Sequence, residues 1–354
     1  MSPQHDAIYE ALGNVIDPEL RRPVTDLDMV RDIRIDGGHV EVTIALTVAG
    51  CPLRGSFEQQ VDEHVGRVPG VEAVSLSFDV MTPDEKAALT ARLRGGVDAR
   101  SKGISVDAAT RVIAVASGKG GVGKSSLTVN LAAAFWEREK RTGILDADVY
   151  GHSIPHMLGV RQRPVVVDRM IVPPVAHDLH LMSIGFFLDD NQPLMWRGPM
   201  LHRALEQFLS DVHWPKLDVL LVDMPPGTGD VAISLGQLLP RAEVVVVTTP
   251  QPLAQEVAAR AAQMAKKTDL RLVGAVENMT GPVFGSGGGE ALARQLAIPL
   301  LGKVPLDPRL RESSDRAKPL VLADPDADAA RAIRAIARAI DERSTSFRAL
   351  PLVS

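Results

Sequence analysis

The chain has 354 residues and a formal net charge of −5 at pH 7, and 45% of its residues are hydrophobic. This length predicts two domains with enough apolar material for a large buried core. The acidic balance argues against nucleic acid as a partner. The chain has no apolar run long enough to suggest a membrane span, which needs about 18 residues. The first residues also lack the basic and apolar regions of a signal peptide, so we expect a cytoplasmic protein.

Residues 1–82 are predicted to form a small α+β domain. Helical spacing of apolar residues occurs at 6–15 and 54–65, and strand-like alternation occurs at 40–48 and 71–78. Residues 83–107 are rich in alanine, arginine and glycine and are expected to form a linker.

Residues 108–354 are predicted to form an α/β domain with a doubly wound, mostly parallel sheet. Strands are expected at 112–117, 143–146, 179–184, 219–223, 244–248, 272–276 and 300–303, and helical patterns separate most of them. Two of these strands are continuous apolar runs, which is typical of parallel strands buried on both faces. In such folds ligands bind at the carboxyl ends of the strands.

A phosphate-binding loop follows the first of these strands. It reads Gly118, Lys119, Gly120, Gly121, Val122, Gly123, Lys124, Ser125 and Ser126, and it fits the G-x-x-x-x-G-K-[ST] pattern of P-loop NTPases. Glycines let the backbone amides surround the phosphates, and the helix that follows points its N-terminus at them. Lys124 is expected to reach the β- and γ-phosphates of ATP, and the Ser125 hydroxyl to bind Mg²⁺.

Lys119 adds a second lysine to this loop, where the ordinary pattern requires none. It could act on the nucleotide of its own chain, or reach a partner's phosphates across a symmetric interface. A solvated lysine without a role is the remaining alternative.

Two acidic residues are predicted to complete the site. Asp223 ends a buried strand, where a carboxylate is costly unless it faces a cation, so we expect it to hold Mg²⁺ directly or through water. Asp148 lies just beyond the strand that ends at Asp146, and we favour Asp148 as the residue that orients the attacking water. Asn278 follows a later strand, and its amide could pair with an adenine edge.

Together these motifs resemble the Mrp/ApbC branch of the deviant Walker-A ATPases, a group that includes MinD and ParA. Beyond the loop, the resemblance is carried by Asp146–Pro155, Trp196–Met200, Asp223–Asp230 and Thr248–Gln251, and in the first domain by Val15–Leu20 and Gly50–Leu53. It implies an ATP-hydrolysing homodimer that carries or assembles iron–sulfur clusters for apo iron–sulfur proteins. It also implies that Lys119 acts across the dimer, that Lys124, Ser125, Asp148 and Asp223 form the ATPase set, and that Asn278 contacts adenine.

The chain departs from this branch in one respect. In the carrier proteins a Cys-x-x-Cys pair follows the Glu-Asn-Met segment, so that two chains together hold a [4Fe–4S] cluster. Here residues 277–289 contain no cysteine, and Cys51 is the only cysteine of the chain. Cys51 precedes a predicted helix, whose N-terminus would favour the thiolate. It is either a contact for iron or a cluster, or a small buried apolar residue.

Two functions remain open at this point. The first is an ATPase that assists iron–sulfur protein maturation, and the second is a nucleotide-controlled dimer switch that acts on a protein client without a cluster. A third, membrane positioning, would need a lipid-binding helix. Residues 326–343 place Ile333, Ile336 and Ile340 on one face, which fits a membrane surface but fits docking on the sheet better.

Overall fold

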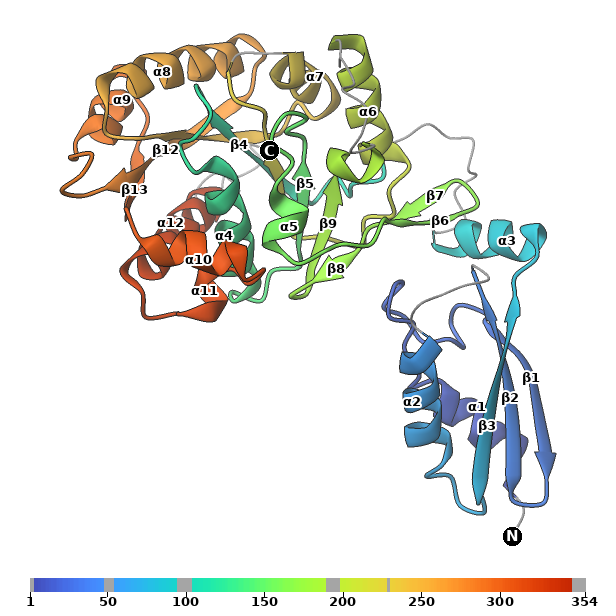
Figure 1. Ribbon diagram of the computed structural model, residues 1–354. Coiled ribbons are helices and arrows are strands. Elements are labelled where there is room, and N and C mark those ends of the chain that lie inside the picture. The colour runs from blue at the N-terminus through green and yellow to red at the C-terminus, as the bar shows by residue number, and fades with distance from the viewer. Residues whose placement is uncertain (1–2, 48–53, 94–103, 189–197, 228–229, 346–354) are drawn as a thin grey trace, which may run out of the picture. The chain divides into compact units, whose positions relative to one another are not determined.

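The computed structural model describes residues 3–47, 54–93, 104–188, 198–227 and 230–345. These residues form two compact units (Figure 1). The small unit contains residues 1–102 together with residues 165–172, and the large unit contains residues 103–164 and 173–354. No helix in the described ranges is both long enough and apolar enough to cross a membrane.

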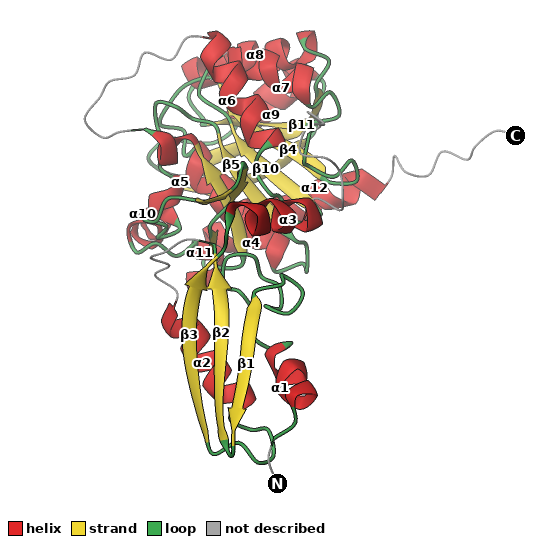
Figure 2. Cartoon of the chain, turned by 90° about the vertical axis from the view of Figure 1, so that its right-hand side faces the viewer, coloured by secondary structure: helices red, strands yellow, loops and turns green. Residues whose placement is uncertain are grey.

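The small unit is built on a three-stranded sheet. β1 (Val30–Asp36) runs antiparallel to β2 (His39–Leu46), and β2 runs parallel to β3 (Ala73–Val80) (Figure 2). Two helices, α1 (His5–Leu12) and α2 (Arg54–Val65), bury apolar side chains in its core. The predicted helix at 54–65 is confirmed with the same bounds. β1 was not predicted, because a register irregularity between Val30 and Asp32 breaks its alternation.

The core of the small unit includes a hairpin that comes from much later in the chain. Residues 83–93, the first part of the expected linker, form α3 (Pro83–Leu93) with Leu89 and Thr90 buried. The hairpin of β6 (Val165–Val167) and β7 (Met170–Val172) contributes three buried residues to the same core cluster as Leu89. The Thr90 Oγ1 hydroxyl donates to the Val167 carbonyl at 3.4 Å. The small unit is therefore completed by a segment about 70 residues away from α3 in the sequence.

The large unit is a doubly wound α/β fold, as predicted. Its eight-stranded sheet has the order β13-β12-β11-β4-β10-β5-β9-β8. All neighbours are parallel except β8 and β9. The strands are β4 (Arg111–Ser117), β5 (Thr142–Asp146), β8 (Val175–Ala176), β9 (Leu179–Ser183), β10 (Val219–Asp223), β11 (Glu243–Thr248), β12 (Arg271–Thr280) and β13 (Leu300–Pro305).

Helices cover both faces of this sheet (Figure 1). One face carries α6 (Gly198–Ser210), α7 (Asp230–Leu238), α8 (Pro252–Lys267) and α9 (Gly288–Leu296). The other carries α4 (Lys124–Trp136), α10 (Pro308–Asp315), α11 (Leu320–Ala323) and α12 (Asp328–Thr345). Two short helices, α5 (Ile154–Met157) and η1 (Ile184–Phe187), lie in the connections after β5 and β9.

The isoleucine face of α12 is part of the core. Ile333, Ile336 and Ile340 are fully buried, and α12 contacts α4 and β13. Docking on the sheet, the alternative that the sequence favoured for this helix, is confirmed. Its apolar face is therefore not available to a membrane surface.

Candidate functional site

The phosphate loop connects β4 to α4 and is shaped by its glycines. Gly121 and Gly123 have φ values of 78° and 77°, a region that favours glycine. A side chain at Gly118 would overlap the backbone of Val257 and Ala258 in α8. The loop borders an open pocket of about 380 Å³. The described residues that line it are Ser117, the loop residues 119–126, Asp148, Tyr150, Gly151, Ser153, Met157 and Pro226.

Lys124 and Ser125 form the floor of this pocket, and behind them both contact the buried carboxylate of Asp223. The Lys124 ammonium lies 2.6 Å from Asp223 Oδ1, and the Asp223 side chain is fully buried. The Ser125 hydroxyl donates to Asp223 Oδ2 at 2.6 Å, and the Thr128 hydroxyl donates to Oδ1 at 3.0 Å. Burial raises the pKa of Asp223, and the Lys124 charge opposes that rise. The structure therefore brings together three residues that the sequence singled out, with Thr128 as a fourth that it missed.

Asp146 and Asp148 have different surroundings. Asp146 is fully buried in register with Asp223, and it accepts hydrogen bonds from the Ser183 hydroxyl at 2.9 Å and from the Asp148 amide at 3.2 Å. Burial, followed by the Asp223 charge, raises the pKa of Asp146 to about 8. The Asp146 carboxylate thus holds the backbone at the start of the loop that follows β5.

Asp148 is the carboxylate that reaches the pocket. Its Oδ1 accepts hydrogen bonds from the amides of Tyr150 at 3.2 Å and Gly151 at 3.1 Å. Its Oδ2 lies 3.6 Å from the Lys124 ammonium. One oxygen is therefore held by the backbone, which leaves the other oriented toward the lysine of the phosphate loop.

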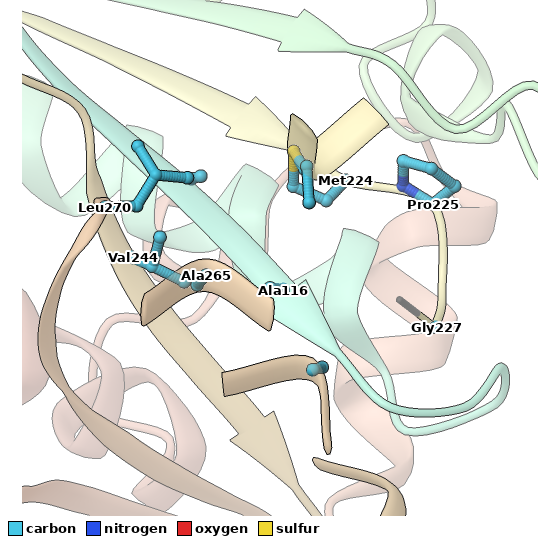
Figure 3. Close-up of a pocket in the computed structure, with 10 residues that line it drawn as sticks. Ala116, Met224, Pro225, Gly227, Val244, Ala265 and Leu270 are labelled. Carbon is cyan, nitrogen blue, oxygen red and sulfur yellow. The ribbon is translucent and has the colours of Figure 1, made fainter. Parts of the chain in front are cut away.

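The segment after Asp223 runs beside the phosphate loop. The Met224 amide donates to the Val115 carbonyl at 3.1 Å, and the Gly227 amide donates to the Ser117 carbonyl at 2.9 Å. Behind it lies a small, mostly apolar cavity of about 20 Å³, which Met224, Pro225 and Gly227 border (Figure 3). A void of this size has room for about one water molecule, and its walls offer that water few polar partners.

Of three other predicted residues, the structure describes two, Lys119 and Asn278. Lys119 is half-buried and lines the pocket. Asn278 is buried, does not line the pocket, and donates a hydrogen bond from Nδ2 to the Val122 carbonyl at 2.8 Å. The adenine contact predicted for Asn278 therefore stays a prediction. Cys51 lies outside the described residues.

Comparison with known proteins gives matches over nearly the whole chain. Residues 108–341 match the family model of the NUBPL iron-transfer P-loop NTPases, and residues 5–76 match that of the iron–sulfur cluster assembly proteins. The iron–sulfur cluster carrier protein of Mycobacterium tuberculosis is 50% identical in an alignment 365 residues long, which covers 98% of this chain and 95% of the relative.

Solved structures of nucleotide-binding proteins match about two thirds of this chain. A nucleotide-binding protein of Archaeoglobus fulgidus in complex with ADP is 35% identical, with a TM-score of 0.53 over 62% of this chain and 89% of that protein. The septum site-determining protein MinD of Pyrococcus horikoshii, complexed with Mg-ADP, shares the fold at 23% identity, with a TM-score of 0.52 over 68% of this chain and all of that protein. The chain belongs to the NUBPL-type iron-transfer P-loop NTPases, the family of the iron–sulfur cluster carrier proteins.

Proposed function

We propose that this protein is an ATP-binding and ATP-hydrolysing homodimer that carries or assembles iron–sulfur clusters. The observation that supports this most directly is the Lys124–Asp223–Ser125 cluster at the floor of a 380 Å³ pocket. Membership in the family of the iron–sulfur cluster carrier proteins supports the assignment of iron–sulfur clusters as what it carries.

The donor atoms of this floor fit Mg²⁺ and phosphate. Mg²⁺ prefers hard oxygen ligands, and the Ser125 hydroxyl and the Asp223 carboxylate lie side by side, 2.6 Å apart. These two residues would hold the ion, and Mg²⁺ when bound neutralises charge on the phosphates. Lys124 would exchange its contact with Asp223 for the β- and γ-phosphates.

Asp148 is suited to orient the attacking water. Its Oδ1 is occupied by two backbone amides, so Oδ2 is the oxygen available to accept a hydrogen bond from water. Phosphoryl transfer depends mostly on positioning and charge stabilisation, and an oriented water meets the first requirement.

Lys119 supplies the proposed link between hydrolysis and dimerisation. It lines the pocket beside the phosphate loop, from which it would reach the phosphates of the second chain. We expect Lys119→Ala to bind nucleotide almost normally while losing hydrolysis and ATP-dependent dimerisation. Hydrolysis by Lys119→Ala at the wild-type rate would show that this lysine has no such role.

The number of cysteines limits how the protein could bind an iron–sulfur cluster. Each chain has one cysteine, Cys51, so a dimer offers two thiolates, whereas a [4Fe–4S] cluster usually has four protein ligands. An apo iron–sulfur protein or another client would have to supply the remaining ligands. In this proposal the cluster is shared transiently with that client and is handed over to it.

The cysteine count also favours a second candidate, a nucleotide-controlled dimer switch that acts on a client without a cluster. Anaerobic reconstitution with iron and sulfide separates the two, with Cys51→Ser as the control. Binding of iron and sulfide, followed by Cys51-dependent transfer to an apo-acceptor, is the result expected of a carrier. ATP hydrolysis with neither iron binding nor transfer would leave only the switch.

A further inference from the structure

Asn278 is bound to the phosphate loop itself. It lies near the end of β12 with 5% of its surface exposed, and its Nδ2 donates to the Val122 carbonyl at 2.8 Å. Only the amino end of an amide side chain can make this contact, because a carbonyl oxygen cannot donate. A side chain at Gly123 would overlap Asn278 Nδ2, so the Asn278 amide packs directly on the Val122–Gly123 peptide.

The strand end that carries Asn278 is itself anchored. The neighbouring carboxylate of Glu277 is fully buried and accepts hydrogen bonds from the Ser286 hydroxyl at 3.1 Å and the Gly287 amide at 3.0 Å. It also accepts one from the Gly289 amide. Because these bonds fix the backbone on both sides of the following turn, Asn278 is presented from a rigid support.

The contact with Asn278 determines which way the loop peptide faces. In a trans peptide the C=O and N–H groups point in opposite directions. Since the Val122 carbonyl points at Asn278, the Gly123 N–H points away from it. Val122 and Gly123 line the pocket and Asn278 does not, so this N–H is directed to the pocket side.

We propose that Asn278 is a positioning residue of the phosphate loop, which holds the Val122–Gly123 peptide with its N–H turned toward the phosphates. The proposal rests on the nucleotide binding proposed above, and it adds a role at the phosphate loop to the base contact predicted from the sequence. A base contact would favour ATP alone, whereas a loop contact acts on every ligand that carries the same phosphates.

The test compares three ligands on the full-length protein by isothermal titration calorimetry: ATP, GTP and inorganic tripolyphosphate, which has no base. We expect Asn278→Ala to weaken all three by about tenfold, the effect of losing roughly one buried hydrogen bond. The loss for tripolyphosphate is decisive, because this ligand has no base that Asn278 could contact. Asn278→Ser, whose hydroxyl is too short to reach Val122, repeats the comparison if the alanine variant does not fold.

Gln255→Ala is the matched control. Gln255 also donates from its amide to a main-chain carbonyl, but this carbonyl, that of Pro250 at 2.9 Å, lies outside the phosphate loop. Its substitution should leave the three affinities unchanged. Loss of ATP affinity alone, no loss for any ligand, or an equal loss in Gln255→Ala would overturn the proposal. Failure of the wild type to bind ATP would instead refute the proposed function.

Discussion

The buried ion pair between Lys124 and Asp223 should control the stability of the nucleotide-free large unit. The Lys124 side chain is 6% exposed and the Asp223 side chain is fully buried, so water screens neither charge. Lys124→Met keeps most of the side-chain volume and removes the charge. The variant then contains a buried carboxylate whose remaining partners are the hydroxyls of Ser125 and Thr128.

Breaking a buried pair in this way typically costs about 3–5 kcal/mol of unfolding free energy. We expect about 3 kcal/mol here, because two hydroxyl donors remain. The loss should depend on pH. Without the lysine, the folded-state pKa of Asp223 lies further above its unfolded value, so stability is lost as pH rises from that value through the folded pKa. The destabilisation should therefore be smaller at pH 5 than at pH 8.

Urea denaturation without nucleotide or magnesium measures this effect. Trp136 and Trp214 belong to the described part of the large unit, so their fluorescence follows its unfolding. The double variant of Lys124→Met with Asp223→Asn should regain most of the lost stability, because no buried charge is left unpaired. The reasoning fails if Lys124→Met at pH 8 lies within about 1 kcal/mol of the wild type, or if the two substitutions simply add.

Four further substitutions test other parts of the structure. Gly118→Ala should abolish ATP binding because a side chain would overlap α8, whereas Gly120→Ala meets no atom within 4 Å and should bind ATP, as calorimetry would show. Burial and a nearby negative charge raise the pKa of Glu19 to about 7, so stability falls as pH rises from about 4.5 to 7. In urea titrations followed by circular dichroism, Glu19→Gln should thus be about 1 kcal/mol more stable than wild type at pH 8 and equal to it at pH 5, after allowance for partial exposure. Met170→Ala should destabilise the small unit by about 2–4 kcal/mol, because Met170 is fully buried in its core, and limited proteolysis should then cleave residues 1–93 faster.

The sequence predicted which residues gather at the strand ends better than it predicted the packing of distant segments. Local patterns predicted the loop at 118–126, the carboxylates of Asp148 and Asp223 and the mostly parallel character of the large sheet, which brings these groups to one edge. Thr128 could not be recognised in the same way, because its role depends on a side chain that lies 95 residues away. The hairpin at 165–172 has no local signal for its partner, because its apolar residues would suit any core.

The ion pair also explains why magnesium and nucleotide would act as one ligand in the proposed mechanism. Without ligand, Lys124 and Asp223 satisfy each other. A phosphate that takes the lysine would leave the carboxylate buried beside Asp146 without its cation, and a metal ion that takes the carboxylate would leave the lysine with only the more distant Asp148. Only the two ligands together replace both halves of the pair. The same exchange moves Lys124, whose Nζ is 3.6 Å from Asp148 Oδ2, so occupation of the phosphate site changes the surroundings of the residue that would orient the water. Binding of nucleotide and Mg²⁺ would therefore also set the surroundings of Asp148 for hydrolysis.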